Sequence, residues 1–506
     1  MKQLLHASGN FVIVGLKDRA FVGPLDNEYI YELDCPPSTS AGKESYGADV
    51  NPLEIQSVAI HRGETNGDLF CAVSRYNKAL SIYKIDSNCF VTIRDQDLTS
   101  HQKIGPITTH KTNKRTGSLC FARIPNMPGA NQIDNGKLII IAGDLAGDAV
   151  AYSLDERPEK EEAIASQPVD LVKMSESEIE HGDDDKTTQS RHLLLGHTAS
   201  MLTSVRVVQD GSETRILTSD RDEKVRVSAF PHAFLIHGYL LGHEAFVSSM
   251  DVATNKGVTR CVTCGGDGTI RIWDYLTCEQ LYVGRPCGEV VASLTDSPEK
   301  QKEKMETVEN AEKSKRLDES SSEADDDGML VPSRIALSPN GNTAVLIFDE
   351  SRRLDIISII DDDGKISTSS STVECASTAL SVAMPDDETV VVLTTDPYFL
   401  ETFQLDGKKT DQVTSTEHAL CSSLRKLGTS FNIQMPASVL EKDKSGQLKM
   451  QKLSEMRGPA NMMPWNNAER VEVAKARNRR SVKKRRQKIV QERREDKRSR
   501  KNSSEP

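Results

Sequence analysis

The chain has 506 residues, a formal net charge of −11 at pH 7, and 37% hydrophobic against 27% charged residues. This balance is typical of a soluble protein with a folded core and additional charged segments. No apolar run approaches the roughly 18 residues that a membrane span requires. Polar residues also interrupt Met1–Leu16 before a secretory signal could form, so we expect an intracellular protein with no membrane contact.

Charge is divided unevenly along the chain. Residues 470–501 contain 16 Lys and Arg against 4 Asp and Glu, a net charge of +12, so the rest of the chain carries −23. Two acidic stretches supply much of that negative charge: residues 155–190 have 12 acidic and 4 basic residues, and residues 295–328 have 12 and 6. Because neither stretch shows apolar periodicity, we expect two disordered acidic insertions and a basic C-terminal arm.

Short strand patterns fill the first part of the chain. Apolar segments typical of antiparallel strands occur in three groups, at about 1–34, 55–84 and 104–154. The first acidic stretch follows. The three groups therefore predict three similar β-sheet units before residue 155.

A unit of about 45 residues is then written twice in succession. The copies begin with the same Leu-Leu-Gly-His sequence, at 194–197 and at 240–243, and the second copy ends with Trp273 and Asp274. A Gly-His start and a Trp-Asp end at this spacing are typical of WD repeats, in which one repeat corresponds to a four-stranded propeller blade.

The polar residues of these repeats predict a structural hydrogen-bond network. In the second copy the chain of partners would be His243, Thr263, Asp267 and Trp273, and it would fix the tight turn at 266–268. The aligned residues of the first copy are His197, Thr218 and Asp222, with Ser228 in place of the Trp. We therefore expect both histidines to stabilise blades and not to act as ligands or bases.

The remaining blades follow from similar patterns. Residues 276–294 begin a sixth unit, which resumes after the second acidic stretch, and a seventh contains the apolar segments between 379 and 403. Seven units fit a closed ring, so the sequence predicts an all-β, seven-bladed WD-repeat β-propeller with acidic inserted loops and a basic C-terminal arm. The predicted segments are blades one to three at 1–154, an insertion at 155–190, blades four and five with the start of six at 191–294, an insertion at 295–328, the remainder with a closing segment at 329–440, and the linker and arm at 441–506.

No motif for catalysis or metal binding accompanies these repeats. The sequence contains no P-loop, no nucleophile elbow and no Gly-rich strand-to-helix loop for a cofactor. Cys261 and Cys264 have zinc-knuckle spacing, but they lie in one predicted strand, where residues three apart point to opposite faces. The ten cysteines are scattered through strand patterns, which favours buried, reduced thiols over a disulfide framework.

One charged run gives the repeats a more specific character. Residues 220–228 read Asp-Arg-Asp-Glu-Lys-Val-Arg-Val-Ser, and residues 241–248 read Leu-Gly-His-Glu-Ala-Phe-Val-Ser. This pair of segments resembles the WD-repeat, non-catalytic subunit of the eukaryotic tRNA guanine-N7 methyltransferase. The resemblance is sharpest over 193–276.

The resemblance implies a function without catalysis in this chain. A subunit of this family binds the catalytic subunit in a heterodimer, and that partner holds S-adenosylmethionine and methylates a guanosine in the tRNA variable loop. This chain would then need no cofactor of its own and would meet tRNA through the complex. The alternative is a general nuclear WD-repeat scaffold, in ribosome assembly or as a ubiquitin-ligase adaptor, because the fold alone permits either.

The resemblance also implies which residues bind the partner. In the family the charged run forms salt bridges to the catalytic subunit, which assigns Arg221, Glu223, Lys224 and Arg226 to that contact. Alternation along a strand would place Lys224 and Arg226 on one face, projecting from the blade, and their valine neighbours on the buried face. The alternative is an ordinary solvated turn with internal ion pairs.

The basic arm has two interpretations of its own. It fits a nuclear localisation signal, a contact to the RNA backbone, or both. Because no aromatic residues are interleaved with its cations, any RNA contact would be independent of sequence. We expect a nuclear protein. The cations concerned are Arg479, Arg480, Lys483, Lys484, Arg485, Arg486 and Lys488.

Overall fold

The computed structural model describes residues 2–34, 51–63, 67–86, 89, 103–125, 136–154, 191–198, 200–210, 213–255, 257–285, 330–362, 365–406 and 409–436. Both acidic stretches, and the segment 441–506 with its seven arm cations, lie outside these residues. The predictions made for those segments therefore stay predictions.

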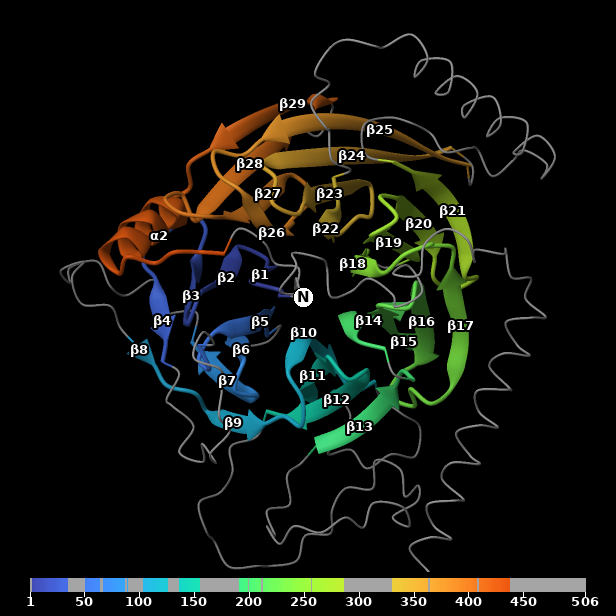
Figure 1. Cartoon of the computed structure of the whole chain (residues 1–506), viewed down its shortest axis with the longest axis horizontal. Helices are drawn as coiled ribbons and strands as arrows, with labels where there is room; N and C mark the ends of the chain where they lie inside the picture. Colours follow the sequence, from blue (N-terminus) through green and yellow to red (C-terminus); the bar gives the residue numbers. More distant parts are fainter. Residues whose placement is uncertain are drawn as a thin grey trace, which may run out of the picture. The chain divides into compact units, whose positions relative to one another are not determined.

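The described strands form seven sheets around a common axis (Figure 1). Blades one to three contain β1 (Leu5–Ser8), β2 (Phe11–Leu16), β3 (Arg19–Pro24), β4 (Tyr31–Leu33) and β8 (Lys103–Ile104); β5 (Ile55–Arg62), β6 (Leu69–Arg75), β7 (Ala79–Ile85) and β9 (Thr108–Lys111); and β10 (Thr116–Arg123), β11 (Leu138–Asp144), β12 (Asp148–Ser153) and β13 (Arg191–Gly196). Blades four and five contain β14 (Leu202–Asp210), β15 (Glu213–Asp220), β16 (Lys224–Ala229) and β17 (Ile236–Leu241), and β18 (Val247–Val252), β19 (Arg260–Gly265), β20 (Ile270–Asp274) and β21 (Glu279–Gly284). Blades six and seven contain β22 (Pro332–Leu337), β23 (Thr343–Phe348), β24 (Arg353–Asp362) and β25 (Lys365–Glu374), and β26 (Ala379–Ala383), β27 (Thr389–Thr394), β28 (Leu400–Asp406) and β29 (Lys409–Thr416).

Each blade is an antiparallel meander that runs outward from the axis. Figure 1 shows the first strand of every blade nearest the centre and the fourth strand at the rim. The short β8 is an addition to blade one and pairs in parallel with β4. This arrangement confirms the predicted seven-bladed β-propeller.

The apolar core lies between neighbouring blades. Ile141 of blade three packs in one cluster with Val205 and Ile216 of blade four. On the other side of blade four, Leu240 packs in a cluster with Trp273 of blade five. Because neighbouring blades cover both faces of the inner strands, these strands are apolar along their length and do not alternate with polar residues.

The sequence repeat and the structural blade are offset by one strand. The Leu-Leu-Gly-His segment that begins each copy forms the end of an outer strand, so β13 completes blade three and β17 completes blade four. In the same way β21 completes blade five, which corrects the expectation that residues 276–294 begin blade six. The acidic stretch 155–190 therefore falls between the third and fourth strands of blade three, and 295–328 falls between blades five and six.

Blade three also begins later than the sequence pattern predicted. The predicted group at 104–154 includes β9, which pairs with β7 and completes blade two. Residues before Thr116 therefore belong to blades one and two. The physical reason is the same offset, because the outer strand follows a long connection and lacks the continuous apolar pattern of the inner strands.

A helix, not a strand, follows the last blade. The helix α2 (Ala419–Ser430) buries Leu420, Leu424 and Leu427 in the cluster that joins blades one and seven. The closing segment predicted at the end of 329–440 thus contains this helix and the short extension after it. Among the described residues no helix is long and apolar enough to cross a membrane.

Candidate protein-binding site

Blade five forms the predicted chain of hydrogen bonds. The imidazole of His243 contacts Thr263 Oγ1 through Nε2 at 2.7 Å and Asp267 Oδ2 through Nδ1 at 3.0 Å. The indole N–H of Trp273 donates to the same Thr263 Oγ1 at 2.9 Å. These contacts connect the blade start, the second strand, the turn and the third strand, which confirms the structural assignment of all four residues.

The Asp267 carboxylate is the electrostatic centre of that network. Burial alone would raise its pKa, but the hydrogen bond with His243 and the backbone N–H groups of Thr269 and Glu244 together hold the pKa well below its usual range. A charged carboxylate that accepts several N–H bonds fixes the turn between β19 and β20.

Blade four takes its carboxylate from a different position, which corrects the assignment of Asp222. His197 contacts Thr218 Oγ1 at 2.8 Å as predicted, but its Nδ1 contacts Asp220 Oδ2 at 2.7 Å. The equivalent of Asp220 in blade five is Gly265, where a Cβ would lie 2.9 Å from the His243 ring. A carboxylate can therefore contact the histidine from the last residue of the second strand, as Asp220 does, or from the turn, as Asp267 does.

Asp222 has a lesser role in the same turn. Its backbone N–H donates to Asp220 Oδ1 at 2.8 Å, and its own carboxylate lies 3.8 Å from Arg221 Nε near the surface. The sequence signal that was missed is Asp220, the first aspartate of the Asp220-Arg221-Asp222 segment, which stands where the neighbouring repeat has Gly265. Alignment of the two repeats with a shift of 45 residues selected Asp222 as the partner of the histidine, whereas the structure shows Asp220.

The buried Asp220 carboxylate also binds Lys224. The Lys224 ammonium lies 3.1 Å from Asp220 Oδ2, and its side chain is 32% exposed. Burial alone would raise the pKa of Asp220, but the hydrogen bond with His197 and the Lys224 charge outweigh it and lower that pKa. Lys224 is therefore held against the blade as well as being accessible from outside.

Arg221 and Glu223 lie in the turn between β15 and β16, which we call the charged turn (Arg221–Lys224). Glu223 has a left-handed backbone with φ of 72°, like Gly268 at 71° in blade five. This conformation is a general feature of the propeller, because the turn between the second and third strands of every blade has one residue with positive φ. The seven residues are Lys17, Lys78, Gly147, Glu223, Gly268, Glu350 and Phe399.

Arg226 does not project from the blade, so that prediction was wrong. Its guanidinium is buried and donates to Ser228 Oγ at 2.9 Å and to the Ala233 carbonyl at 2.7 Å. Burial lowers the pKa of Arg226. Ser228 is the residue that replaces the Trp of blade five, and its hydroxyl accepts from Arg226. The valines on both sides of Arg226 are buried as expected.

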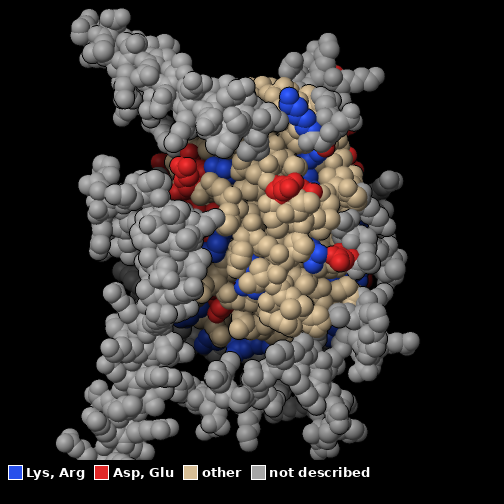
Figure 2. Space-filling view, turned by 90° about the vertical axis from the view of Figure 1, so that its right-hand side faces the viewer, with Lys and Arg blue, Asp and Glu red and all other residues tan. Residues whose placement is uncertain are grey.

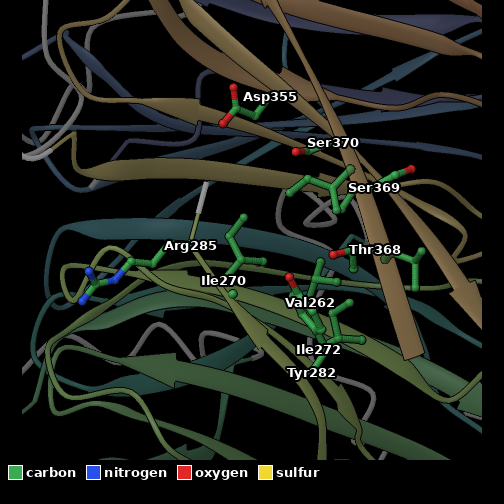
Figure 3. A pocket seen from close by; sticks show the side chains of 13 residues that line it. Val262, Ile270, Ile272, Tyr282, Arg285, Asp355, Thr368, Ser369 and Ser370 are labelled. Atoms are coloured by element: carbon green, nitrogen blue, oxygen red, sulfur yellow. The ribbon is translucent and has the colours of Figure 1, made fainter. Parts of the chain in front are cut away.

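A cavity of about 220 Å³ lies between blades five and six (Figure 3). Its wall is largely apolar, with Ile270, Ile272 and Tyr282 from blade five. The buried Asp355 at its edge is neutralised by Arg353 at 2.7 Å and accepts a hydrogen bond from Thr372. Thr368, Ser369 and Ser370 of blade six also line the cavity.

The thiols give no metal site within the described part of the chain. Cys261 and Cys264 point to opposite faces of β19, one into each neighbouring cluster, as predicted. Burial raises the pKa of the Cys264 thiol to about 12. Within the described ranges no group of three or more His, Cys, Asp or Glu side chains could hold a metal ion, and the eight cysteines there are free thiols.

Comparison with known proteins gives a family match for the part of the chain that contains the charged turn. Residues 168–396 match the WD40 domain of the tRNA methyltransferase TRM82 family. The matched region is less than half of the chain. Of the described elements, this match includes β13 to β27, and so contains both hydrogen-bond networks and the charged turn.

Individual TRM82-like relatives agree with the family match. The chain is 25% identical over 253 residues to the tRNA (guanine-N(7)-)-methyltransferase non-catalytic subunit wuho of Aedes aegypti, which is 50% of this chain and 47% of the relative. It is 30% identical over 197 residues to the subunit TRM82 of Saccharomyces cerevisiae, which is 39% of this chain and 35% of the relative. The chain thus matches less than half the length of these relatives.

A solved structure resembles the fold more distantly. A chain of the mitotic checkpoint complex has a TM-score of 0.46 and 14% identity, over 80% of this chain and 89% of that chain.

Proposed function

We propose that this chain is the non-catalytic subunit of a tRNA guanine-N7 methyltransferase, and that it binds and stabilises the catalytic subunit in a heterodimer. The observation that carries the proposal is the match of residues 168–396 to the TRM82 WD40 domain. The relatives that share this domain are named non-catalytic subunits of that enzyme. In this proposal the catalytic partner holds S-adenosylmethionine, and this chain meets tRNA through the complex.

The geometry of blade four supports the charged turn as part of the contact. The turn begins where Asp220 is fixed by His197 and Lys224, so its backbone is set before any partner arrives. A preformed surface loses less conformational entropy on binding than a loop that must become ordered. Charges of both signs on such a surface determine register and partner choice more than affinity.

Arg226 enters this proposal as a positioning residue. Its buried guanidinium connects β16 to the Ala233 carbonyl, so reversing its charge would bury a carboxylate against carbonyl oxygens. The same holds in part for Lys224, which pairs with buried Asp220. Lys224 and Arg226, two of the four predicted contact residues, therefore also have partners inside the blade.

The experiment compares two glutamates that occupy equivalent turns. We expect Glu223→Gly to weaken binding of the catalytic subunit at least about 10-fold, because it removes a charge from the surface of this chain that contacts the partner. The matched control is Glu350→Gly, the left-handed residue of blade six. Both variants should keep the free energy of unfolding within about 1 kcal/mol of wild type, since relief of the left-handed backbone offsets the entropy cost of glycine.

The readouts are co-purification, calorimetric affinity and methylation of a tRNA transcript. Wild-type chain alone should transfer no methyl groups, and the complex should do so. Failure of the wild-type chain to bind the catalytic subunit would contradict the proposed function. Equal affinity of the two glycine variants would instead remove the charged turn from the contact.

We also propose that the complex works in the nucleus, supported by the run of cations from Arg479 to Lys488. A fluorescent chain that lacks residues 470–506 should lose nuclear accumulation. Its thermal transition should stay unchanged, because few apolar residues are removed. Unchanged localisation would contradict this proposal.

A further inference from the structure

Blade four exposes a cluster of large apolar side chains at its outer edge. They belong to β17 and to the turn before it, and we call them the β17 strip. Leu241 is 59% exposed and Leu235 54% exposed, values unusual for leucine in a folded domain. The strip consists of Phe234, Leu235, Ile236, Tyr239 and Leu241.

The position of β17 in its blade does not require this composition. The equivalent outer strands of blades six and seven read Lys-Ile-Ser-Thr-Ser-Ser-Ser-Thr-Val-Glu (β25) and Lys-Thr-Asp-Gln-Val-Thr-Ser-Thr (β29). Those sequences are mostly polar, as expected for an edge strand in water. Figure 2, which presents the side of the ring where β17 lies, shows a broad surface with few charged side chains.

The strip is held in a fixed conformation. The turn before β17 is tied to β16 by the Arg226 guanidinium on the Ala233 carbonyl at 2.7 Å, and by the Ala229 N–H on the Leu235 carbonyl at 2.9 Å. The Phe230 N–H also donates to the Thr214 carbonyl at 2.9 Å. An exposed apolar segment with this many backbone contacts is a preformed surface and not a frayed edge.

The strip is continuous with the charged turn. In the antiparallel register, Leu241 stands opposite Lys224, and Tyr239 stands opposite Arg226. Opposed residues share a face, so Tyr239 and Leu241 lie on the same side of the blade as the two cations. Leu240 points the other way, into the core between blades four and five.

We propose that the β17 strip is the apolar centre of the surface that binds the catalytic subunit, with the charged turn at its rim. This inference rests on the proposed function. A desolvated apolar centre bordered by polar residues is the usual organisation of a stable interface. The partner would present an apolar face with charged side chains of both signs at its border, which would complement Arg221, Glu223 and Lys224. Self-association through a second copy is the competing occupancy, and sedimentation of the chain alone tests it below.

The test introduces a charge into the strip. Leu241→Lys in the full chain should weaken binding of the catalytic subunit at least about 30-fold, because a lysine would have to be buried at the centre of the contact. The matched control is Ile360→Lys on β24 of blade six, where the isoleucine is 47% exposed. We expect the control to bind like wild type. Both variants should keep the wild-type melting temperature, since neither side chain lies in the core.

The outcomes separate this inference from the function on which it rests. If wild type binds the catalytic subunit and Leu241→Lys binds equally well, the strip is not part of the contact, although the proposed function stands. If wild type does not bind it, the proposed function fails, and this inference with it. Sedimentation of the chain alone gives the third arm: a wild-type dimer that Leu241→Lys dissociates, with partner affinity unchanged, would assign the strip to self-association and overturn the inference.

Discussion

Two aspartates in one turn show how strongly burial decides the role of a residue. Asp220 is fully buried and contacts His197, Lys224 and the Asp222 N–H, whereas the Asp222 side chain is 32% exposed. The two residues are chemically identical and two positions apart. Only the first connects the blade start to the turn.

This difference predicts opposite results for the same substitution. Asp220→Ala should lower the free energy of unfolding by about 2–3 kcal/mol, because it leaves buried donors without their charged acceptor. Asp222→Ala removes only a surface ion pair and should change it by less than about 0.5 kcal/mol. Chemical denaturation of both variants measures the difference. A larger loss for Asp222→Ala would return the turn-fixing role to the residue that the sequence alignment selected.

The pH dependence of Asp220 and Asp267 has one sign. Both carboxyl groups have a folded-state pKa below the usual value, so each stabilises the fold above pH 4 or so, and this contribution is lost as the pH falls through the folded-state pKa. The networks of blades four and five are therefore intact at neutral pH.

At the scale of elements, the sequence predicted inner strands far better than outer ones. The first three strands of a blade are buried on both faces, so their apolar runs, such as the one around Ile139–Ile141, identify them directly. Outer strands are half-exposed and mixed in composition. Nothing in β13 or β21 alone states whether it ends one blade or begins the next, since that depends on hydrogen bonds to a strand already placed.

The candidate site divides in the same way. The blade-five network could be predicted because His243, Thr263, Asp267 and Trp273 keep the spacing of a complete repeat. The burial of Arg226 could not be predicted, because strand alternation shows on which face a side chain lies but not whether a neighbouring loop covers that face. Here the loop carbonyl of Ala233 covers it.

The helix α2 was missed for a comparable reason. Its buried residues Leu420, Cys421, Leu424 and Leu427 have helical spacing, but the helix is only 12 residues long. Their burial depends on blades one and seven, which are at opposite ends of the chain. A short amphipathic segment of this kind is defined by tertiary packing more than by propensity.

At the scale of the whole molecule, the seven innermost strands bring distant polar residues together around the axis. His6 on β1 accepts a hydrogen bond from the Ile60 N–H of β5 through Nδ1 at 3.2 Å. The charged groups that act on it come from other blades: Arg206 on β14, Asp251 on β18, and the neighbouring His61. Arg206 and Asp251 pair with each other at 2.9 Å.

This position makes His6 a source of acid sensitivity for the ring. Burial, with the nearby Arg206 charge, lowers the pKa of His6 to about 4, against about 6.5 in an unfolded chain. Between these values the unfolded chain binds the additional proton, so stability falls as the pH drops from about 6.5 towards 4. At pH 5 the loss from this one group is as much as about 2 kcal/mol.

The variant His6→Asn should remove that loss, because its amide oxygen can accept from Ile60 N–H but does not take up a proton. We expect its melting temperature to decrease less than that of wild type between pH 7.5 and pH 5, while the two proteins differ little at pH 7.5. All other titrating groups are shared, so the difference between the two pH profiles isolates His6. Parallel profiles would mean that water or rearrangement of the axis accommodates the protonated ring, and that the first blade is not closed against the second as tightly as the Ile60 contact implies.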